Sequence, residues 1–111
     1  MAPGQWAPGN RGGMLTEVLM AVAELSVIPI VEGSLRPYVR LAIEEVRKSG
    51  LACEVGAMGT TIEGGLDELL KVAGDAHRAV RAAGAGRVVT TIRIDDRDQE
   101  LTIAGKLEGL R

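Results

Sequence analysis

The chain is poor in aromatic residues, cysteine and histidine. Its 111 residues include no Phe, one Tyr, one Trp, one Cys and one His. Proteins that bind single-stranded nucleic acid stack the bases on aromatic rings, and this composition leaves few rings for that purpose. The net charge of -2 points the same way, because nucleic-acid-binding domains are usually basic. A nucleic-acid partner is therefore not expected.

The same scarcity disfavours metal sites and disulfides. One Cys and one His cannot supply a zinc ligand set within one chain, so no metal site is expected. Cys53 has no partner for an internal disulfide, which favours a reducing, cytoplasmic environment. No apolar run approaches the ~20 residues that span a bilayer, and no secretory signal is visible, so no membrane association is expected.

The remaining composition is that of a globular domain, with 46% hydrophobic and 25% charged residues. Residues 1–13 are rich in Gly and Pro and show no periodicity. We predict a disordered N-terminal tail there, with Met14 and Met20 as alternative starts. Residues 14–111 are predicted to form one ligand-binding domain.

Hydrophobic periodicity predicts the order β-α-β-β-α-β. Strands are predicted over residues 19–30, 51–58, 60–64 and 87–94. The first helix is expected to begin at an N-cap, Ser34, and to end at Gly50, and the second helix is expected to run from Leu66 to Gly84. The last segment, residues 100–110, alternates at first and is expected to add a short strand or a turn.

Each predicted helix carries a single apolar stripe, so both helices are expected to cover one face of a four-stranded antiparallel sheet. This is the α+β ferredoxin-like plait. Alternation along the strands assigns these residues to the face without helices: Glu24, Ser26, Ile28, Val89, Thr91, Arg93 and Asp95. One interpretation is a solvated face on which Arg93 pairs with Glu24 or Glu54. The other is a subunit interface with polar pockets.

Several strings, in this order and spacing, carry a family resemblance: "AELSVIPI", "KSGL", "AMGTTIEG", "RVVTTIRIDDR" and "GKLEGL". Together they resemble the MTH1187/YkoF-like family of thiamine-binding proteins, also called UPF0045. The resemblance covers about residues 20–110. It implies a ferredoxin-like fold, dimers and a homotetramer built from them, and binding of thiamine or its hydroxymethylpyrimidine part. It implies no catalysis, and thiamine would be a bound ligand rather than a cofactor.

Thiamine needs hydrogen-bonding partners for its aminopyrimidine and a tolerant environment for its cationic thiazolium. The candidate ligand-binding residues are Ser26, Met58, Thr60, Thr61, Glu63, His77 and Thr91. Glycines in "EVGAMGTTIEGGL" would allow the backbone to approach a flat ring. Structural roles compete with this hypothesis: the glycines as turn residues, Glu63 at the N-terminus of the second helix, Met58 as a core or interface residue, and His77 as a packed core residue.

Two other functions fit the same order of elements. The first is an ACT-like allosteric module that binds amino acids between subunits. The second is an enzyme, which would need a nucleophile with an adjacent base. Only Cys53 and His77 suggest such a pair, and nothing in their spacing brings them together. The sequence therefore favours a small-molecule-binding protein that is not an enzyme.

Overall fold

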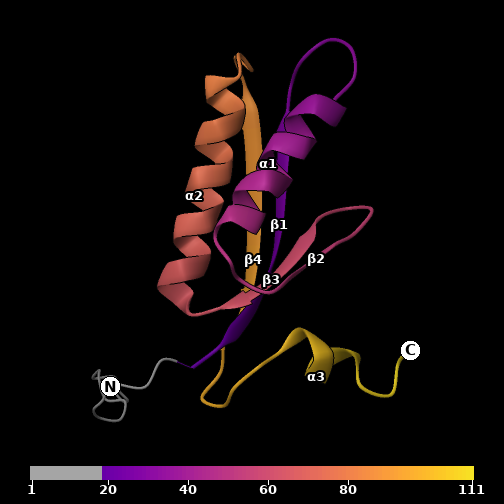
Figure 1. Ribbon diagram of the computed structural model, residues 1–111, viewed down its shortest axis with the longest axis vertical. Helices are drawn as coiled ribbons and strands as arrows, with labels where there is room; N and C mark the ends of the chain where they lie inside the picture. The colour runs from indigo at the N-terminus through magenta and orange to yellow at the C-terminus, as the bar shows by residue number, and fades with distance from the viewer. Residues whose placement is uncertain (1–18) are drawn as a thin grey trace.

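The structure, a computed structural model, describes residues 19–111 and contains a four-stranded antiparallel sheet with two long helices on one face (Figure 1). Its elements are β1 (Ala21–Pro29), α1 (Arg36–Lys48), β2 (Cys53–Val55), β3 (Thr60–Gly64), α2 (Leu66–Ala82), β4 (Val88–Asp95) and α3 (Ile103–Leu107). The sheet order β2-β3-β1-β4 confirms the predicted ferredoxin-like plait. The predicted tail, residues 1–13, lies outside the described residues.

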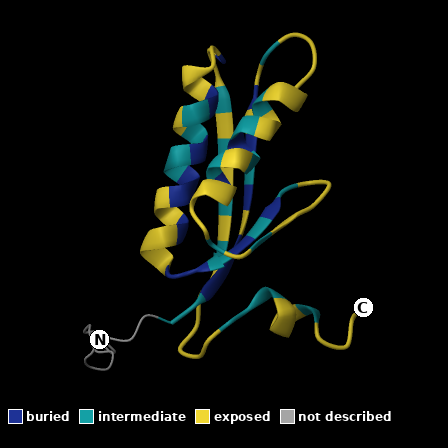
Figure 2. Ribbon diagram, in the orientation of Figure 1, coloured by how far each residue is buried: buried dark blue, intermediate teal, exposed yellow. Residues whose placement is uncertain are grey.

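The hydrophobic core lies between the sheet and helices α1 and α2, as the burial pattern shows (Figure 2). In β1, Leu25 and Val27 are buried, whereas Glu24 and Ile28 are exposed. In β4, half-buried and exposed residues alternate along the whole strand. The faces predicted from alternation are therefore confirmed, because side chains one residue apart in a strand point to opposite faces.

Several boundaries differ from the predictions by one or two residues, and two differences bear on the site. The N-cap of α1 is Leu35 rather than Ser34, although the Ser34 hydroxyl accepts a hydrogen bond from the Arg36 N–H at 3.2 Å. The second strand is confined to Cys53–Val55, because the chain turns immediately afterwards. The N–H of Gly56 donates to the carbonyl of Gly59 at 2.9 Å and closes this turn.

The C-terminal segment differs more from its predicted structure. The predicted strand or turn is wrong in part, because a short helix, α3, precedes a terminal turn. The Thr102 hydroxyl caps α3 by accepting a hydrogen bond from the Gly105 N–H at 2.9 Å. The Glu63 carboxylate accepts from the Ile103 N–H, and Lys106 pairs with Asp95, so α3 attaches to the face of the sheet without helices α1 and α2.

Among residues 19–111, no helix is long and apolar enough to cross a bilayer.

Candidate functional site

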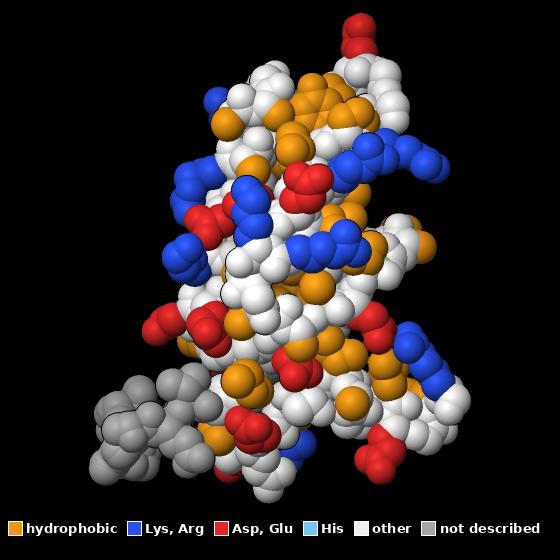
Figure 3. Space-filling model, in the orientation of Figure 1, with side chains coloured by type: hydrophobic (Ala, Val, Ile, Leu, Met, Phe, Trp, Pro, Cys, Tyr) orange, Lys and Arg blue, Asp and Glu red, His pale blue; other side chains and the backbone are white. Residues whose placement is uncertain are grey.

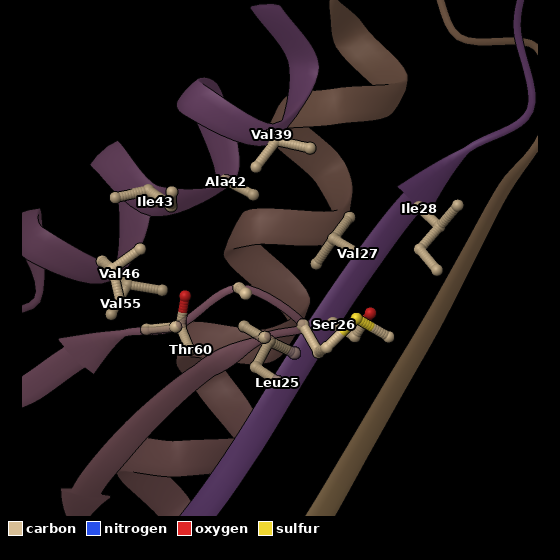
Figure 4. Close-up of a pocket in the computed structure, with 14 residues that line it drawn as sticks. Leu25, Ser26, Val27, Ile28, Val39, Ala42, Ile43, Val46, Val55 and Thr60 are labelled. Carbon is tan, nitrogen blue, oxygen red and sulfur yellow. The ribbon is translucent and has the colours of Figure 1, made fainter. Parts of the chain in front are cut away.

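A pocket opens before the start of β3, beside the longer strand β1. Thr60, the first residue of β3, pairs with Leu25. From there to Pro29, β4 is the only strand neighbour of β1 among residues 19–111. Helix α1 passes over this gap, and the Gly56–Gly59 turn closes its outer side (Figure 4). The pocket encloses about 230 Å³. It therefore results from the unequal lengths of two paired strands.

The pocket is mainly apolar and carries two hydroxyl groups. Among residues 19–111, no charged side chain lines it, and the residues with hydroxyls are Ser26 and Thr60. Figure 4 shows Val39, Ala42, Ile43 and Val46 of α1 on the side of the pocket opposite Leu25 and Val27 of β1. The whole lining is Leu25, Ser26, Val27, Ile28, Val39, Ala42, Ile43, Val46, Val55, Gly56, Ala57, Met58, Gly59 and Thr60. Such a lining suits a flat, neutral group with a few hydrogen-bonding atoms.

Gly59 fixes how closely the turn approaches β1. A Cβ atom at this position would lie 3.0 Å from the Leu25 carbonyl oxygen and 3.2 Å from Cγ of Glu24. A side chain would therefore push the turn away from β1 and change the width of the pocket mouth. The glycine-rich stretch noted in the sequence thus has a packing role here.

The predicted site residues lie in three places: the pocket, the face of the sheet without α1 and α2, and, for His77, the contact between α2 and β4. Met58 and Thr60 line the pocket, and Ser26 lines it at the open edge of β1, although its side chain belongs to the face without α1 and α2. Thr61 and Thr91 lie on the face without α1 and α2, since each is in register with a residue of that face. The predicted residues therefore do not form one wall.

Glu63 and His77 lie outside the pocket lining. The Glu63 carboxylate accepts a hydrogen bond from the Ile103 N–H at 2.8 Å. His77 Nδ1 lies 2.7 Å from the Thr90 hydroxyl, which joins α2 to β4. Cys53 is a free cysteine on β2, at the opposite edge of the sheet from β4. The structure thus gives no pairing of Cys53 with His77.

Sequence reasoning missed the apolar half of the pocket. Val39 and Ile43 belong to the apolar stripe of α1, and that stripe does not distinguish residues that fill the core from residues that line a gap. Their exposure carries the signal instead: Val39 and Val55 are 39% and 44% exposed, and Met58 is 87% exposed. Such values indicate apolar side chains that the folded chain itself leaves uncovered.

A second hollow of about 390 Å³ lies on the face without α1 and α2. Its lining includes Thr61 and two ion pairs, Arg93 with Glu24 and Lys106 with Asp95. The predicted pair of Arg93 with Glu24 is confirmed at 3.1 Å, whereas Glu54 pairs with Arg111. Exposed pairs of this kind contribute only about 0–1 kcal/mol to stability. This hollow is thus polar and internally neutralised.

The surface seen from the helical side carries both signs of charge. Figure 3 shows Lys and Arg side chains interspersed with Asp and Glu over the helices, with hydrophobic side chains between them. Among residues 19–111, no three His, Cys, Asp or Glu side chains are grouped where they could hold a metal ion. The apolar pocket is therefore the feature best suited to a small organic ligand.

A family model and a related protein sequence both match most of the chain. Residues 23–111 match a family described as thiamine-binding protein. The UPF0045 protein MJ1052 from Methanocaldococcus jannaschii is 46% identical over 91 residues, which are 80% of this chain and 90% of that protein.

Solved structures agree in fold. A Bacillus cereus domain of unknown function, DUF77, has a TM-score of 0.80 and 40% identity, covering 85% of this chain and 92% of that one. A Thermotoga maritima protein, described as a candidate thiamine biosynthesis/salvage protein, has a TM-score of 0.77 and 28% identity. That match covers 83% of this chain and 99% of the other.

Proposed function

Because the chain belongs to the thiamine-binding protein family, we propose that it binds thiamine, or the hydroxymethylpyrimidine moiety of thiamine, without catalysing a reaction on it. The observation that carries this proposal is the apolar pocket between β1, α1 and the Gly56–Gly59 turn. Its apolar walls can cover the faces of a ring. The Thr60 hydroxyl, on the same side of the sheet as Leu25, can reach the polar edge of that ring, and Ser26 lies at the open edge of β1.

The size and charge of the pocket favour the pyrimidine half of the ligand. Pockets for drug-sized ligands occupy roughly 300–1,000 Å³, whereas this one encloses about 230 Å³. Since no charged side chain of the described residues lines it, none of them would offset the desolvation of a thiazolium cation inside. We therefore place the pyrimidine ring inside, with the thiazolium of thiamine extending through the mouth into solvent.

The same lining disfavours the amino-acid-binding alternative. A zwitterion that enters a pocket must exchange hydration for charged or strongly polar partners. Within the part of the chain that the structure describes, this pocket is lined by two residues with hydroxyls and by no charged side chain. We therefore keep the ACT-like function only as an outcome to be tested.

Isothermal titration calorimetry tests the proposal directly. We expect heat with thiamine and with 4-amino-5-hydroxymethyl-2-methylpyrimidine, and none with a panel of amino acids. The reverse result would replace the proposed function by the amino-acid-binding one. The variant Val39→Trp locates the site, because it fills the pocket from α1. Leu70→Trp is a matched control, since Leu70 is exposed on α2 and does not line the pocket.

We expect Val39→Trp to lose binding and Leu70→Trp to retain it, with both variants folded by circular dichroism. Equal binding by both variants would move the ligand to another site. Absence of binding by the unmodified protein would remove the proposed function altogether.

Self-association is the second part of the proposal. Ile28 and Val89 are cross-strand neighbours on the face without α1 and α2, and each is 44% exposed. Adjacent apolar side chains on a bare sheet face are a common basis for subunit contacts. A second copy covering this face would form a dimer, and the homotetramer implied by the family resemblance would need a second contact between such dimers. The free Cys53 favours a cytoplasmic location for this assembly.

A further inference from the structure

Along β1, the backbone N–H and C=O groups of successive residues point alternately toward β3 and toward β4. The strand pairings show which residues point to which strand. The Ile30 N–H donates to the Arg87 carbonyl at 2.8 Å, in continuation of the register that pairs Pro29 with Val88. Because the N–H and C=O of one strand residue point to the same side and alternate along the strand, even-numbered residues of β1 face β4. Odd-numbered residues then face β3.

The pairing of β3 gives the same answer independently. The Glu63 N–H donates to the Ala52 carbonyl at 2.9 Å, so odd-numbered residues of β3 face β2. Even-numbered residues of β3 therefore face β1, and Thr60 lies opposite Leu25 as a hydrogen-bonded pair. The two strands thus agree that the N–H and C=O of Val27 point to the side where β3 is missing.

Val27 therefore presents an unpaired donor and acceptor to the pocket. The register of β1 with β3 ends at the Leu25–Thr60 pair, and Val27 lines the pocket beyond it. Within residues 19–111, neither backbone group of Val27 has a hydrogen-bonded partner. Val27 is only 7% exposed. Backbone groups of this kind are nearly always paired with protein, water or ligand, so in the pocket they are available to water or to a bound ligand.

We infer that the N–H and C=O of Val27 recognise the ligand by hydrogen-bonding to a ring edge that carries an amine beside a ring nitrogen. The ring nitrogen accepts from the Val27 N–H, and the amine donates to the Val27 carbonyl. The ligand thereby takes the place of the residue that β3 would have placed opposite Val27. This inference rests on the proposed function and adds the recognition mode to it.

The donor–acceptor order selects among related rings. The aminopyrimidine of thiamine carries its amine next to a ring nitrogen, which matches the C=O and N–H of one extended residue. A thiazolium ring has no N–H to donate, so it cannot make the same pair. In the same orientation, a 4-oxo-pyrimidine presents an acceptor to the Val27 carbonyl where the amine presents a donor. To pair its N3–H with that carbonyl it must turn over, which exchanges the two sides of the ring within the pocket. Figure 4 shows the apolar side chains of α1 across the pocket from β1, where they would cover a face of the ring.

The test replaces the Val27 N–H by an ester oxygen, using the α-hydroxy acid analogue of valine. The single Cys53 allows this protein to be assembled by ligation of a synthetic segment ending at Ala52. Two ligands are titrated by calorimetry: 4-amino-5-hydroxymethyl-2-methylpyrimidine, and its analogue with CH in place of the ring nitrogen beside the amine. We expect the ester to weaken the first ligand about ten-fold and to leave the second unchanged.

A matched ester at Ile28 checks the register without any ligand. The Ile28 N–H faces β4 and is expected to be hydrogen-bonded there, so its removal should lower the melting temperature more than the Val27 ester does. Equal losses of stability at the two positions would overturn the assignment of the unpaired groups. This measurement also shows whether the Val27 ester is folded.

The outcomes separate the inference from the proposed function. Equal binding of the first ligand by the ester and the unmodified protein would overturn the inference and leave the proposed function intact. Equal affinity of both ligands for the unmodified protein would also overturn the inference and leave the proposed function intact. If the unmodified protein binds neither ligand nor thiamine, the proposed function itself fails.

Discussion

The carboxylate of Glu63 accepts a hydrogen bond from the backbone N–H of Ile103 at 2.8 Å, across 40 positions of sequence. It thereby ties the start of α3 to β3. In the sheet register, Val22 lies between Glu63 and Asp95, and Asp95 pairs with Lys106 of α3. Val22 belongs to the face without α1 and α2 and yet is only 5% exposed. We attribute its burial to the C-terminal segment held by these two acids.

The first prediction concerns Glu63. The change Glu63→Ala removes the acceptor of the Ile103 N–H, and we expect a loss of about 1–3 kcal/mol in the free energy of unfolding. We also expect faster hydrogen exchange at the Ile103 amide. Thiamine affinity should be unchanged, because Glu63 does not line the apolar pocket.

Glu108→Ala is the control, since it changes an exposed acid that follows α3. It should leave both stability and exchange at Ile103 nearly unchanged. A fall in thiamine affinity without a fall in stability in Glu63→Ala would instead favour Glu63 as a ligand-binding residue, as the sequence first indicated.

The second prediction concerns Gly59. Alanine at this position would place its Cβ 3.0 Å from the Leu25 carbonyl oxygen, so the turn must move. We expect Gly59→Ala to cost about 1–3 kcal/mol in stability and to weaken ligand binding. Gly86→Ala is the matched control, because its Cβ would meet no atom within 4 Å and its φ is not positive. Equal denaturation midpoints for the two variants would contradict the close packing of the turn.

The plait was predictable because it follows from local patterns. Alternation along β4 correctly separated Val89 and Arg93 from Val88 and Ile92, since a strand has a period of two residues. The apolar stripes correctly predicted α1 and α2, because a helix that packs on a sheet shows one apolar side. Both signals depend only on neighbours in sequence.

The pocket was not predictable in the same way. It exists because β3 begins at Thr60, opposite Leu25, while β1 continues to Pro29. The register between two strands far apart in sequence sets this gap, and periodicity within each strand does not encode it. Helix α3 escaped prediction for a related reason: it has 5 residues and no buried side chain, so it leaves no apolar stripe.

The third prediction concerns pH. Hydrogen bonds from Lys71 and then Arg78 lower the pKa of the Asp75 carboxyl below its ordinary value of 3.8. Because the folded pKa is lowered, the contribution of Asp75 to stability is present above the ordinary value. It is lost as the pH falls through the folded pKa.

NMR titration of the Asp75 side chain checks this shift. We expect a midpoint below 3.8 in the folded protein, with Lys71→Ala raising it more than Arg78→Ala does. High salt should also raise it, because exposed ion pairs are screened. A midpoint that neither substitution moves would show that these two bases do not hold the carboxylate.

The fourth prediction concerns the proposed subunit contact. Val89 is 44% exposed beside Ile28, so Val89→Glu places a charge in the middle of the apolar pair. We expect the unmodified protein to elute as a dimer or tetramer in size-exclusion chromatography with light scattering, and Val89→Glu to shift it to a smaller species. Leu70→Glu, at a comparably exposed position on α2, should elute at the same size as the unmodified protein. If the unmodified protein is a monomer at every concentration, the sheet face is solvated and its ion pairs stabilise the monomer alone.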